Sequence, residues 1–185
     1  MGKIVELTVA RGVGRPEWVP EGELFWWARQ ARLATPTYGD QLTRAEVLFM
    51  EKFEALGERA EWIPKTRAAK TADFYWTSRD GRPWDIKSPS LEGWGTMTVK
   101  QQYKRIAGRI SDDAPFKKNV VVDLGSEVLT DELAQKLAEY NAGRWRTPEH
   151  LIRKLVILAD SVLRVIPLRM EMQGVDLALA HHMGT

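Results

Sequence analysis

The chain has 185 residues, of which 44% are hydrophobic, and a net charge of +2, which is enough apolar material for the core of one domain. It contains no cysteine, which excludes disulfides, zinc–thiolate centres and thiol catalysis. The three histidines are scattered, so any metal ion would lie among carboxylates, as Mg²⁺ and Mn²⁺ prefer.

The apolar runs of the sequence are short. None reaches the length of a membrane span, and residues 1–5 lack the apolar core of a signal peptide. We therefore expect a protein that acts in the cytoplasm and does not contact a membrane. The oligomeric state is not predicted by any of these features.

The first part of the chain is the least informative. Residues 1–40 contain several glycines and prolines and an aromatic-rich stretch over 21–33, and we predict an N-terminal extension that precedes or packs on the core. The next helix is clearer. Thr43 and Glu46 have the spacing of a capping box, and Gly57 stands where a helix commonly ends.

Beyond this helix the apolar spacing alternates between the periods of strands and helices. It predicts strands over residues 61–64, 72–77, 82–88, 118–124, 154–159 and 162–168, and helices over 96–110 and 130–140. The order predicts an α/β (α+β) fold with a mixed central sheet flanked by helices, over residues 41–170, followed by a tail, 171–185.

The hairpin over residues 72–88 carries the chemistry. With a loop at 79–81, Asp73 faces Lys87, and the apolar and polar side chains lie on opposite faces of the hairpin. One face then comprises Phe74, Trp76, Trp84 and Ile86, and the other comprises Asp73, Tyr75, Asp85 and Lys87. A two-residue loop would mix apolar and charged side chains on both faces, so burial favours the odd-length loop.

On the polar face, two carboxylates and one ammonium are predicted to converge. Asp73 and Asp85 would repel each other unless a cation lay between them, and a divalent ion there would orient a phosphate. Lys87 could position or activate water, or stabilise the charge that develops on phosphate. The alternative is a solvated hairpin with a weak cross-strand ion pair.

These residues resemble the PD-(D/E)XK phosphodiesterase superfamily, in which an Asp on one strand precedes Asp or Glu, any residue and Lys on the next. Asp73 follows Ala72 where the family has proline, and Asp85, Ile86 and Lys87 form the second half. The resemblance implies a restriction-endonuclease-like fold, a metal-dependent nuclease and Mg²⁺ or Mn²⁺ as cofactor, with Asp73 and Asp85 as metal ligands and Lys87 as the catalytic lysine.

Residues 43–168 are similar in more detail to the C-terminal toxin domains of bacterial contact-dependent growth inhibition proteins, a branch that includes tRNA-cleaving nucleases. The likeness lies in Asp73-Phe74 and in the run Trp84 to Pro89. It implies an RNA substrate, with tRNA favoured over DNA, and a cognate immunity protein as partner. Residues 1–40 match nothing in this branch.

Supporting residues have both a functional and a structural interpretation. Glu46 is implied as a third metal ligand and catalytic residue, but it also fits the capping box. Gln102 could reach water or phosphate, or could be an ordinary residue at a helix border. A nucleic-acid-binding role is assigned to Lys65, Arg67, Lys70, Lys100, Gln102, Lys104, Arg144 and Arg146. A solvated helix face is the alternative for Lys100 and Lys104.

Two competing functions remain at this point. One is a DNA nuclease of a phage or mobile element, because the same fold serves both substrates. The other is a non-catalytic nucleic-acid-binding or assembly module on the same scaffold, with residues 1–40 as its interaction element.

Overall fold

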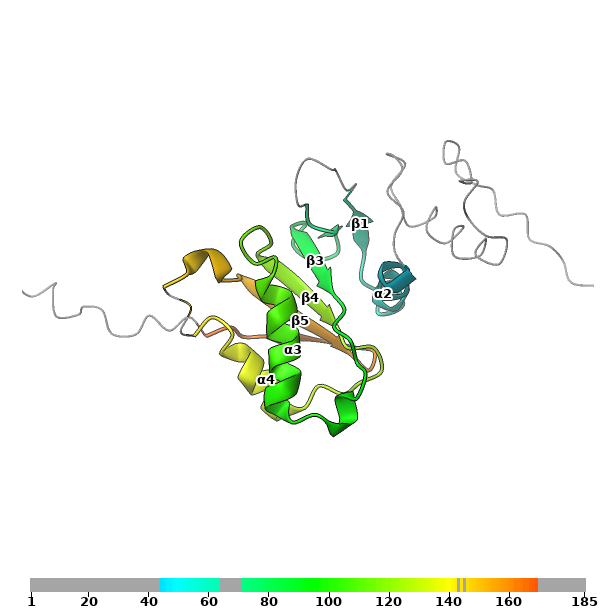
Figure 1. Ribbon diagram of the computed structural model, residues 1–185. Helices are drawn as coiled ribbons and strands as arrows, with labels where there is room; N and C mark the ends of the chain where they lie inside the picture. The colour runs from blue at the N-terminus through cyan, green and yellow to red at the C-terminus, as the bar shows by residue number, and fades with distance from the viewer. Residues whose placement is uncertain (1–43, 64–70, 143, 145, 170–185) are drawn as a thin grey trace, which may run out of the picture.

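The computed structural model describes residues 44–63, 71–142, 144 and 146–169, and the predicted extension and tail lie outside these ranges (Figure 1). The helices within them are α2 (Arg44–Ala55), α3 (Val99–Ser111) and α4 (Asp131–Ala138), with short 3-10 turns at Trp94–Thr96 and Pro148–His150. The strands are β1 (Ala60–Trp62), β2 (Phe74–Trp76), β3 (Pro83–Lys87), β4 (Asn119–Asp123), β5 (Lys154–Ala159) and β6 (Val162–Ile166).

The six strands form one sheet in the order of the sequence, from β1 to β6. The pairs at both edges are antiparallel, whereas β3, β4 and β5 are parallel. Helices α3 and α4 supply the two crossovers that parallel neighbours require. The predicted α/β class with a mixed sheet flanked by helices is confirmed.

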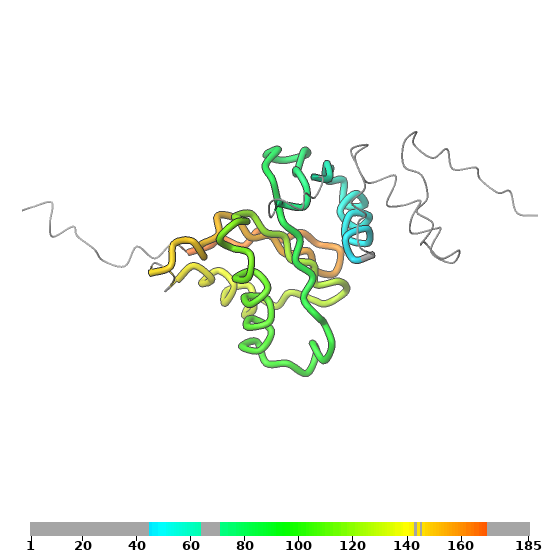
Figure 2. Tube along the Cα trace, turned by 45° about the horizontal axis from the view of Figure 1, so that its top comes forward, coloured from blue at the N-terminus to red at the C-terminus, as the bar shows by residue number. Residues whose placement is uncertain are grey.

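The two faces of the sheet have separate cores. On one face, α2 packs with Phe49 and Phe53 against Phe74 of the hairpin, and their ring centroids are 5.8 and 5.5 Å from that of Phe74. On the other, α3 and α4 cover the remaining side of the parallel strands. Figures 1 and 2 show α3 and α4 together, with α2 apart from them.

The parallel strands alternate between these cores. Val121 of β4 contributes to the core under α2, and Val120 and Val122 contribute to the core under α3. Because Asp85 pairs with Val120 and Lys87 with Val122, these two charged side chains lie on the α3 side of the sheet. Apolar Trp84 and Ile86 lie on the α2 side, as the alternation predicts.

The register of the hairpin differs from the prediction. The structure pairs Phe74 with Trp84 and Tyr75 with Pro83, whereas the sequence predicted Phe74 opposite Ile86. The pairing is therefore displaced by two residues along β3. Because side chains alternate with a period of two, this displacement leaves each of them on its predicted face. The prediction of which face each side chain occupies was correct, and the prediction of its cross-strand partner was wrong.

The turn of the hairpin explains the displacement. The Trp76 N–H donates to the carbonyl of Arg82 at 3.1 Å, so the loop runs over 77–81 rather than the predicted 79–81. Its last residue, Gly81, has φ +61°, the left-handed conformation that glycine adopts without steric cost.

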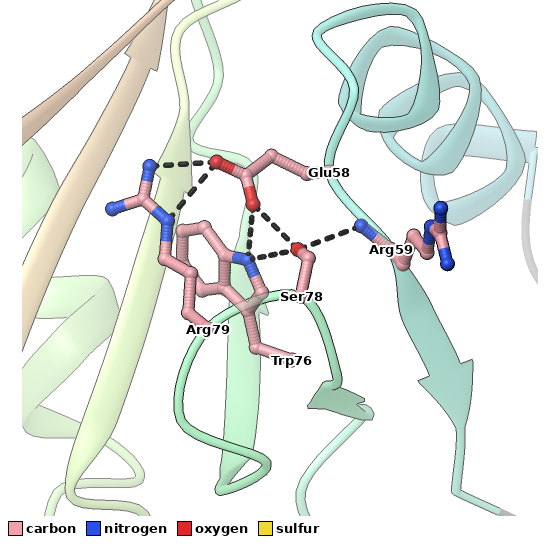
Figure 3. Close-up of polar contacts among 5 residues, drawn as sticks. All are labelled: Glu58, Arg59, Trp76, Ser78 and Arg79. Atoms are coloured by element: carbon pink, nitrogen blue, oxygen red, sulfur yellow. Dashed lines mark hydrogen bonds and ion pairs between the residues drawn. The ribbon is translucent and has the colours of Figure 1, made fainter.

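A single carboxylate, Glu58, holds this longer loop (Figure 3). It accepts hydrogen bonds from the Trp76 indole at 2.7 Å, the Ser78 hydroxyl at 2.6 Å and the Arg79 guanidinium at 2.6 Å. The Ser78 hydroxyl also accepts from the Arg59 N–H at 2.8 Å. Ser78 and Arg79 are thereby drawn out of the strand ladder and into the loop.

The other predicted elements are confirmed with small shifts of their ends. The apolar stripe of α3 is as predicted, with Ile106 and Ile110 buried and Val99 and Tyr103 packed against the same core. Within the described residues, no helix is long and apolar enough to cross a membrane.

Candidate active site

Asp85 lies at the centre of the site. It is in the middle of β3, and none of its side chain is accessible to solvent. Its Oδ2 is 2.7 Å from the Lys87 ammonium, and its Oδ1 forms an ion pair with Lys117. An ionised carboxylate this deeply buried requires such compensation, and here each of its oxygens has a cation.

Asp73 immediately precedes β2, the strand that pairs with β3. The β2–β3 ladder ends at the pair Phe74–Trp84, and the Asp73 N–H donates to the Trp84 carbonyl at 2.9 Å, so the predicted pairing of Asp73 with Lys87 is wrong. Its Oδ2 accepts a hydrogen bond of 2.7 Å from the Ile86 N–H. Its pKa also responds to the charge of Asp85, so the two predicted metal ligands are neighbours in space.

The electrostatic state of Asp73 differs from that of Asp85. Burial raises the pKa of Asp73 and the adjacent Asp85 carboxylate raises it further, to about 7, although the Ile86 N–H opposes the shift. Repulsion between the two carboxylates therefore adds to the effect of burial on Asp73.

Lys87 bridges two acids. Its ammonium contacts Asp85 and also donates to Asp113, and only 13% of its side chain is exposed. Burial lowers the pKa of Lys87, but hydrogen bonds from the ammonium to Asp113 and Asp85 and the charges of both carboxylates outweigh burial and hold the pKa above its usual value. Lys87 is therefore a cation in this arrangement, suited to stabilise negative charge rather than to remove a proton.

Sequence reasoning missed two residues of this cluster, Asp113 and Lys117. Both lie in the turn after α3, 26 and 32 residues from their partners. Their signal was indirect: they lie between the crossover helix and β4, and β4 is the strand that pairs in parallel with β3 at Asp85. Only knowledge of that pairing places the turn beside the aspartates.

A small cleft of about 180 Å³ opens beside Lys87 and is also lined by Ile86, Ser88, Arg109, Asp112 and Asp113. Arg109 is exposed at the end of α3, so the cleft has a second cation at its mouth. A larger groove of about 890 Å³ lies between the turn of the hairpin and β5–β6, and none of Asp73, Asp85 and Lys87 lines it. Asp73 and Asp85 line neither space, and Lys87 alone of the three borders the smaller cleft.

Glu46 is not brought to the aspartates. Its helix packs on the face of the sheet that carries Trp84 and Ile86, whereas Asp85 and Lys87 extend from the opposite face. Among the described residues, no group of three His, Cys, Asp or Glu side chains is placed to hold a metal ion. The structure therefore offers two carboxylates, rather than the three that the sequence suggested.

Gln102 does not reach the site as predicted. Its side-chain amide donates to the carbonyl of Trp94 at 3.1 Å, and both residues are buried. The pair anchors the segment between β3 and α3, and Arg105 reinforces it through the carbonyls of Ser90 and Glu92, at 2.8 and 2.9 Å. The structural interpretation of Gln102 is the one that its contacts support.

The remaining predicted nucleic-acid contacts fall into three groups. Lys100 and Lys104 are exposed on α3, and this exposure fits both a phosphate-binding face and a solvated face. Arg144 lies 4.0 Å from the ring centre of Tyr140 and bonds to its carbonyl, which gives it a structural role, while Arg146 is exposed. The cluster of Lys65, Arg67 and Lys70 lies outside the described residues.

The donor set suits a hard divalent ion. Mg²⁺ is commonly bound through one or two carboxylates, with water and substrate phosphate completing its coordination. Asp73 and Asp85 supply two neighbouring carboxylates. The pKa of Asp73 is raised by burial and by repulsion from Asp85, and a divalent ion between the two would relieve that repulsion. The residues present therefore fit the ion that the sequence predicted.

Comparison with known proteins adds little to this geometry. A scan of protein-family models finds no match to the chain, and a search of curated proteins finds none. One matching chain comes from the solved structure of a CdiA-CT/CdiI toxin and immunity complex from Burkholderia pseudomallei, at 15% identity and a TM-score of 0.45. The match covers 72% of this chain and 96% of that one, and a superposition this loose defines no shared function.

Proposed function

We propose that the protein is a metal-dependent nuclease that hydrolyses phosphodiester bonds. One observation carries the proposal: Asp73 and Asp85 are buried together on adjacent strands, with the Lys87 ammonium 2.7 Å from Asp85. In soluble domains a buried pair of like charges costs free energy, and it persists chiefly where a function requires it.

Each residue has a distinct task in this proposal. Asp73 and Asp85 would hold a Mg²⁺ or Mn²⁺ ion, which supplies the Lewis acidity for attack at phosphorus when it is bound. Lys87, which remains protonated, offers its ammonium to the negative charge that develops on the phosphate. Asp113 orients Lys87, and Arg109 at the mouth of the cleft can contact a neighbouring phosphate.

The substrate, the biological role and the partner are the finer part of the proposal. RNA, with tRNA favoured, a role as a bacterial toxin and a cognate immunity protein as partner all follow from the likeness of residues 43–168 to toxin domains. We include the superfamily assignment and its restriction-endonuclease-like fold on the same basis.

A non-catalytic nucleic-acid-binding module is the second candidate, and a specific observation favours it. Asp85 is paired with two lysines, and Lys87 with two aspartates, so this part of the cluster is stable without a metal ion. A structural network would have the same contacts.

A cleavage assay separates the two candidates. Wild type, Asp73→Asn and the control Asp131→Asn are incubated with total tRNA, single-stranded DNA or plasmid, each with Mg²⁺, Mn²⁺ or EDTA. Asp131 is a suitable control because 81% of its side chain is exposed, away from the cleft. The nuclease proposal expects cleavage that EDTA and Asp73→Asn abolish and that Asp131→Asn preserves. Folded wild type that cuts none of the substrates would favour the binding module.

A further inference from the structure

Lys117 occupies a position that the proposed chemistry does not use. It lies in the turn between α3 and β4, and its ammonium contacts Oδ1 of Asp85, while only 13% of the lysine side chain is exposed. The adjacent Lys118 points elsewhere and donates to the carbonyl of Leu151 at 2.9 Å. The turn thus delivers one specific lysine to the buried aspartate.

Lys117 acts on both candidate metal ligands. It pairs directly with Asp85, and its charge also lowers the pKa of Asp73, which burial and Asp85 raise more strongly. An ammonium with this influence lies close to the space that a divalent ion shared by the two carboxylates would require. Two cations cannot both take Oδ1 of Asp85 without strong repulsion.

The two lysines on Asp85 are not equivalent. Lys87 has a second carboxylate, Asp113, which holds it whether or not Asp85 is available. Among the described residues, Lys117 has an ion pair with Asp85 and with no other acid. Displacing Lys117 therefore breaks one ion pair, and its flexible four-carbon stem lets the ammonium move away without a change in the backbone.

We propose that Lys117 is a displaceable counter-ion that competes with the divalent metal for Asp85. This inference rests on the proposed nuclease function, because it assumes that Asp73 and Asp85 bind a metal ion. Without the ion, Lys117 neutralises Asp85 and keeps the buried site close to electrical balance. When the ion binds, the same lysine leaves the carboxylate, so its presence weakens the affinity of the site for metal.

Binding of Mn²⁺ alone to the full chain, measured by titration calorimetry, tests the inference without any assay of activity. Lys117→Met removes the competing charge and should tighten Mn²⁺ binding on the order of tenfold, the scale of one close charge acting on a carboxylate. Lys117→Gln should tighten it in the same direction, and Lys117→Arg, which keeps the charge, should not. A purely structural role for Lys117 would predict weaker binding on its removal.

Lys136→Met is the matched control, because it removes one lysine from an exposed ion pair with Glu139 on α4. Its affinity for Mn²⁺ should change by less than about twofold, because solvent and salt screen distant charges. Circular dichroism confirms that each variant is folded, and Lys117→Gln serves if Lys117→Met does not fold.

The outcomes distinguish this inference from the proposed function. If wild type binds Mn²⁺ and Asp73→Asn does not, the metal site stands, and unchanged or weaker binding by the Lys117 variants overturns the counter-ion role alone. If neither wild type nor Lys117→Met binds Mn²⁺, both proposals fall. Binding that only the Lys117 variants show would support the competition in its strongest form.

Discussion

The two ends of the β2–β3 hairpin shift the pKa of a carboxylate in opposite directions. At the turn, Glu58 accepts hydrogen bonds from Trp76, Ser78 and Arg79, and although burial raises its pKa, those bonds and the charge of Arg79 lower it to about 2. At the open end, Asp73 has one backbone donor and a second aspartate beside it, and its pKa rises to about 7.

The difference teaches how to separate a structural acid from a functional one. Glu58 is fully satisfied by its own chain, so its ionisation stabilises the fold. Asp73 is buried beside a second carboxylate, which raises its pKa, so its ionisation destabilises the fold. We therefore expect substitutions at the two ends to change stability in opposite directions, and only the open end to affect catalysis.

The largest expected effect is on catalysis, at Lys87. Lys87→Met should lower the rate of metal-dependent cleavage by about a hundredfold or more, because the charge on the phosphate loses its buried cation. Initial rates at saturating Mg²⁺ measure this, with Lys136→Met as a control that removes a lysine far from the cleft. Equal rates for wild type and Lys87→Met would remove the lysine from the mechanism.

The next effect is a gain in stability at Asp73. In metal-free protein at pH 8, Asp73→Asn should raise the free energy of unfolding by about 1 to 3 kcal/mol, because it removes a charge that Asp85 repels while keeping an acceptor for the Ile86 N–H.

The sign of its pH dependence follows from the raised pKa of Asp73. The folded pKa of about 7 lies above the ordinary aspartate value of 3.8, so the stability due to protonated Asp73 is complete below pH 3.8 and is lost as pH rises through 7. Urea unfolding in EDTA should therefore show a larger advantage for Asp73→Asn at pH 8 than at pH 5. An advantage that does not change with pH would contradict the raised pKa of Asp73, to which burial and then the Asp85 charge contribute.

At the turn, the expected effect has the opposite sign. Glu58→Gln should lower the free energy of unfolding by about 1 to 2 kcal/mol at pH 7, because charged hydrogen bonds to Arg79 and Ser78 are lost. The folded pKa of about 2 lies below the ordinary glutamate value of 4.5, so the deficit should shrink as pH falls from 4.5 toward 2. Cleavage per folded molecule should stay at the wild-type rate, and a loss of activity would show that the turn acts on the site.

The smallest effect is expected where a carboxylate is neither buried nor crowded. Asp131 pairs with Arg164 at 2.8 Å, but their side chains are 81% and 47% exposed. Arg164→Met should change the free energy of unfolding by less than about 0.5 kcal/mol, because solvent screens such pairs. Thermal unfolding at low and high salt measures it, and a change comparable with that of Glu58→Gln would show that exposure is a poor guide here.

Much of the fold could be predicted from local patterns. The stripe of α3 and the run Val120 to Val122 each identify an element directly, because burial on one side or on both leaves a distinct apolar period. The longer loop of the hairpin was missed because Glu58, the residue that holds Ser78 and Arg79, lies on a separate segment before β1. Nothing within the hairpin sequence indicates that partner.

The candidate site was predicted in part for the same reason. Asp73, Asp85 and Lys87 were identified because alternation along two short strands sorts them onto one face. Glu46 was expected there on the resemblance, but α2 packs on the opposite face. For Gln102 the sequence left a functional and a structural interpretation open, and its hydrogen bond to Trp94 supports the structural one.

The sequence by itself determined which side chains of the hairpin share a face, since a strand repeats every two residues whatever its partner. The tertiary structure decided which residues from other segments those side chains contact. The parallel pairing of β3 with β4 brings the turn after α3 to Asp85, and with it Lys117 and Asp113. Contacts between residues so far apart in the chain depend on how helices and strands pack, and that packing sets the charge balance of the site.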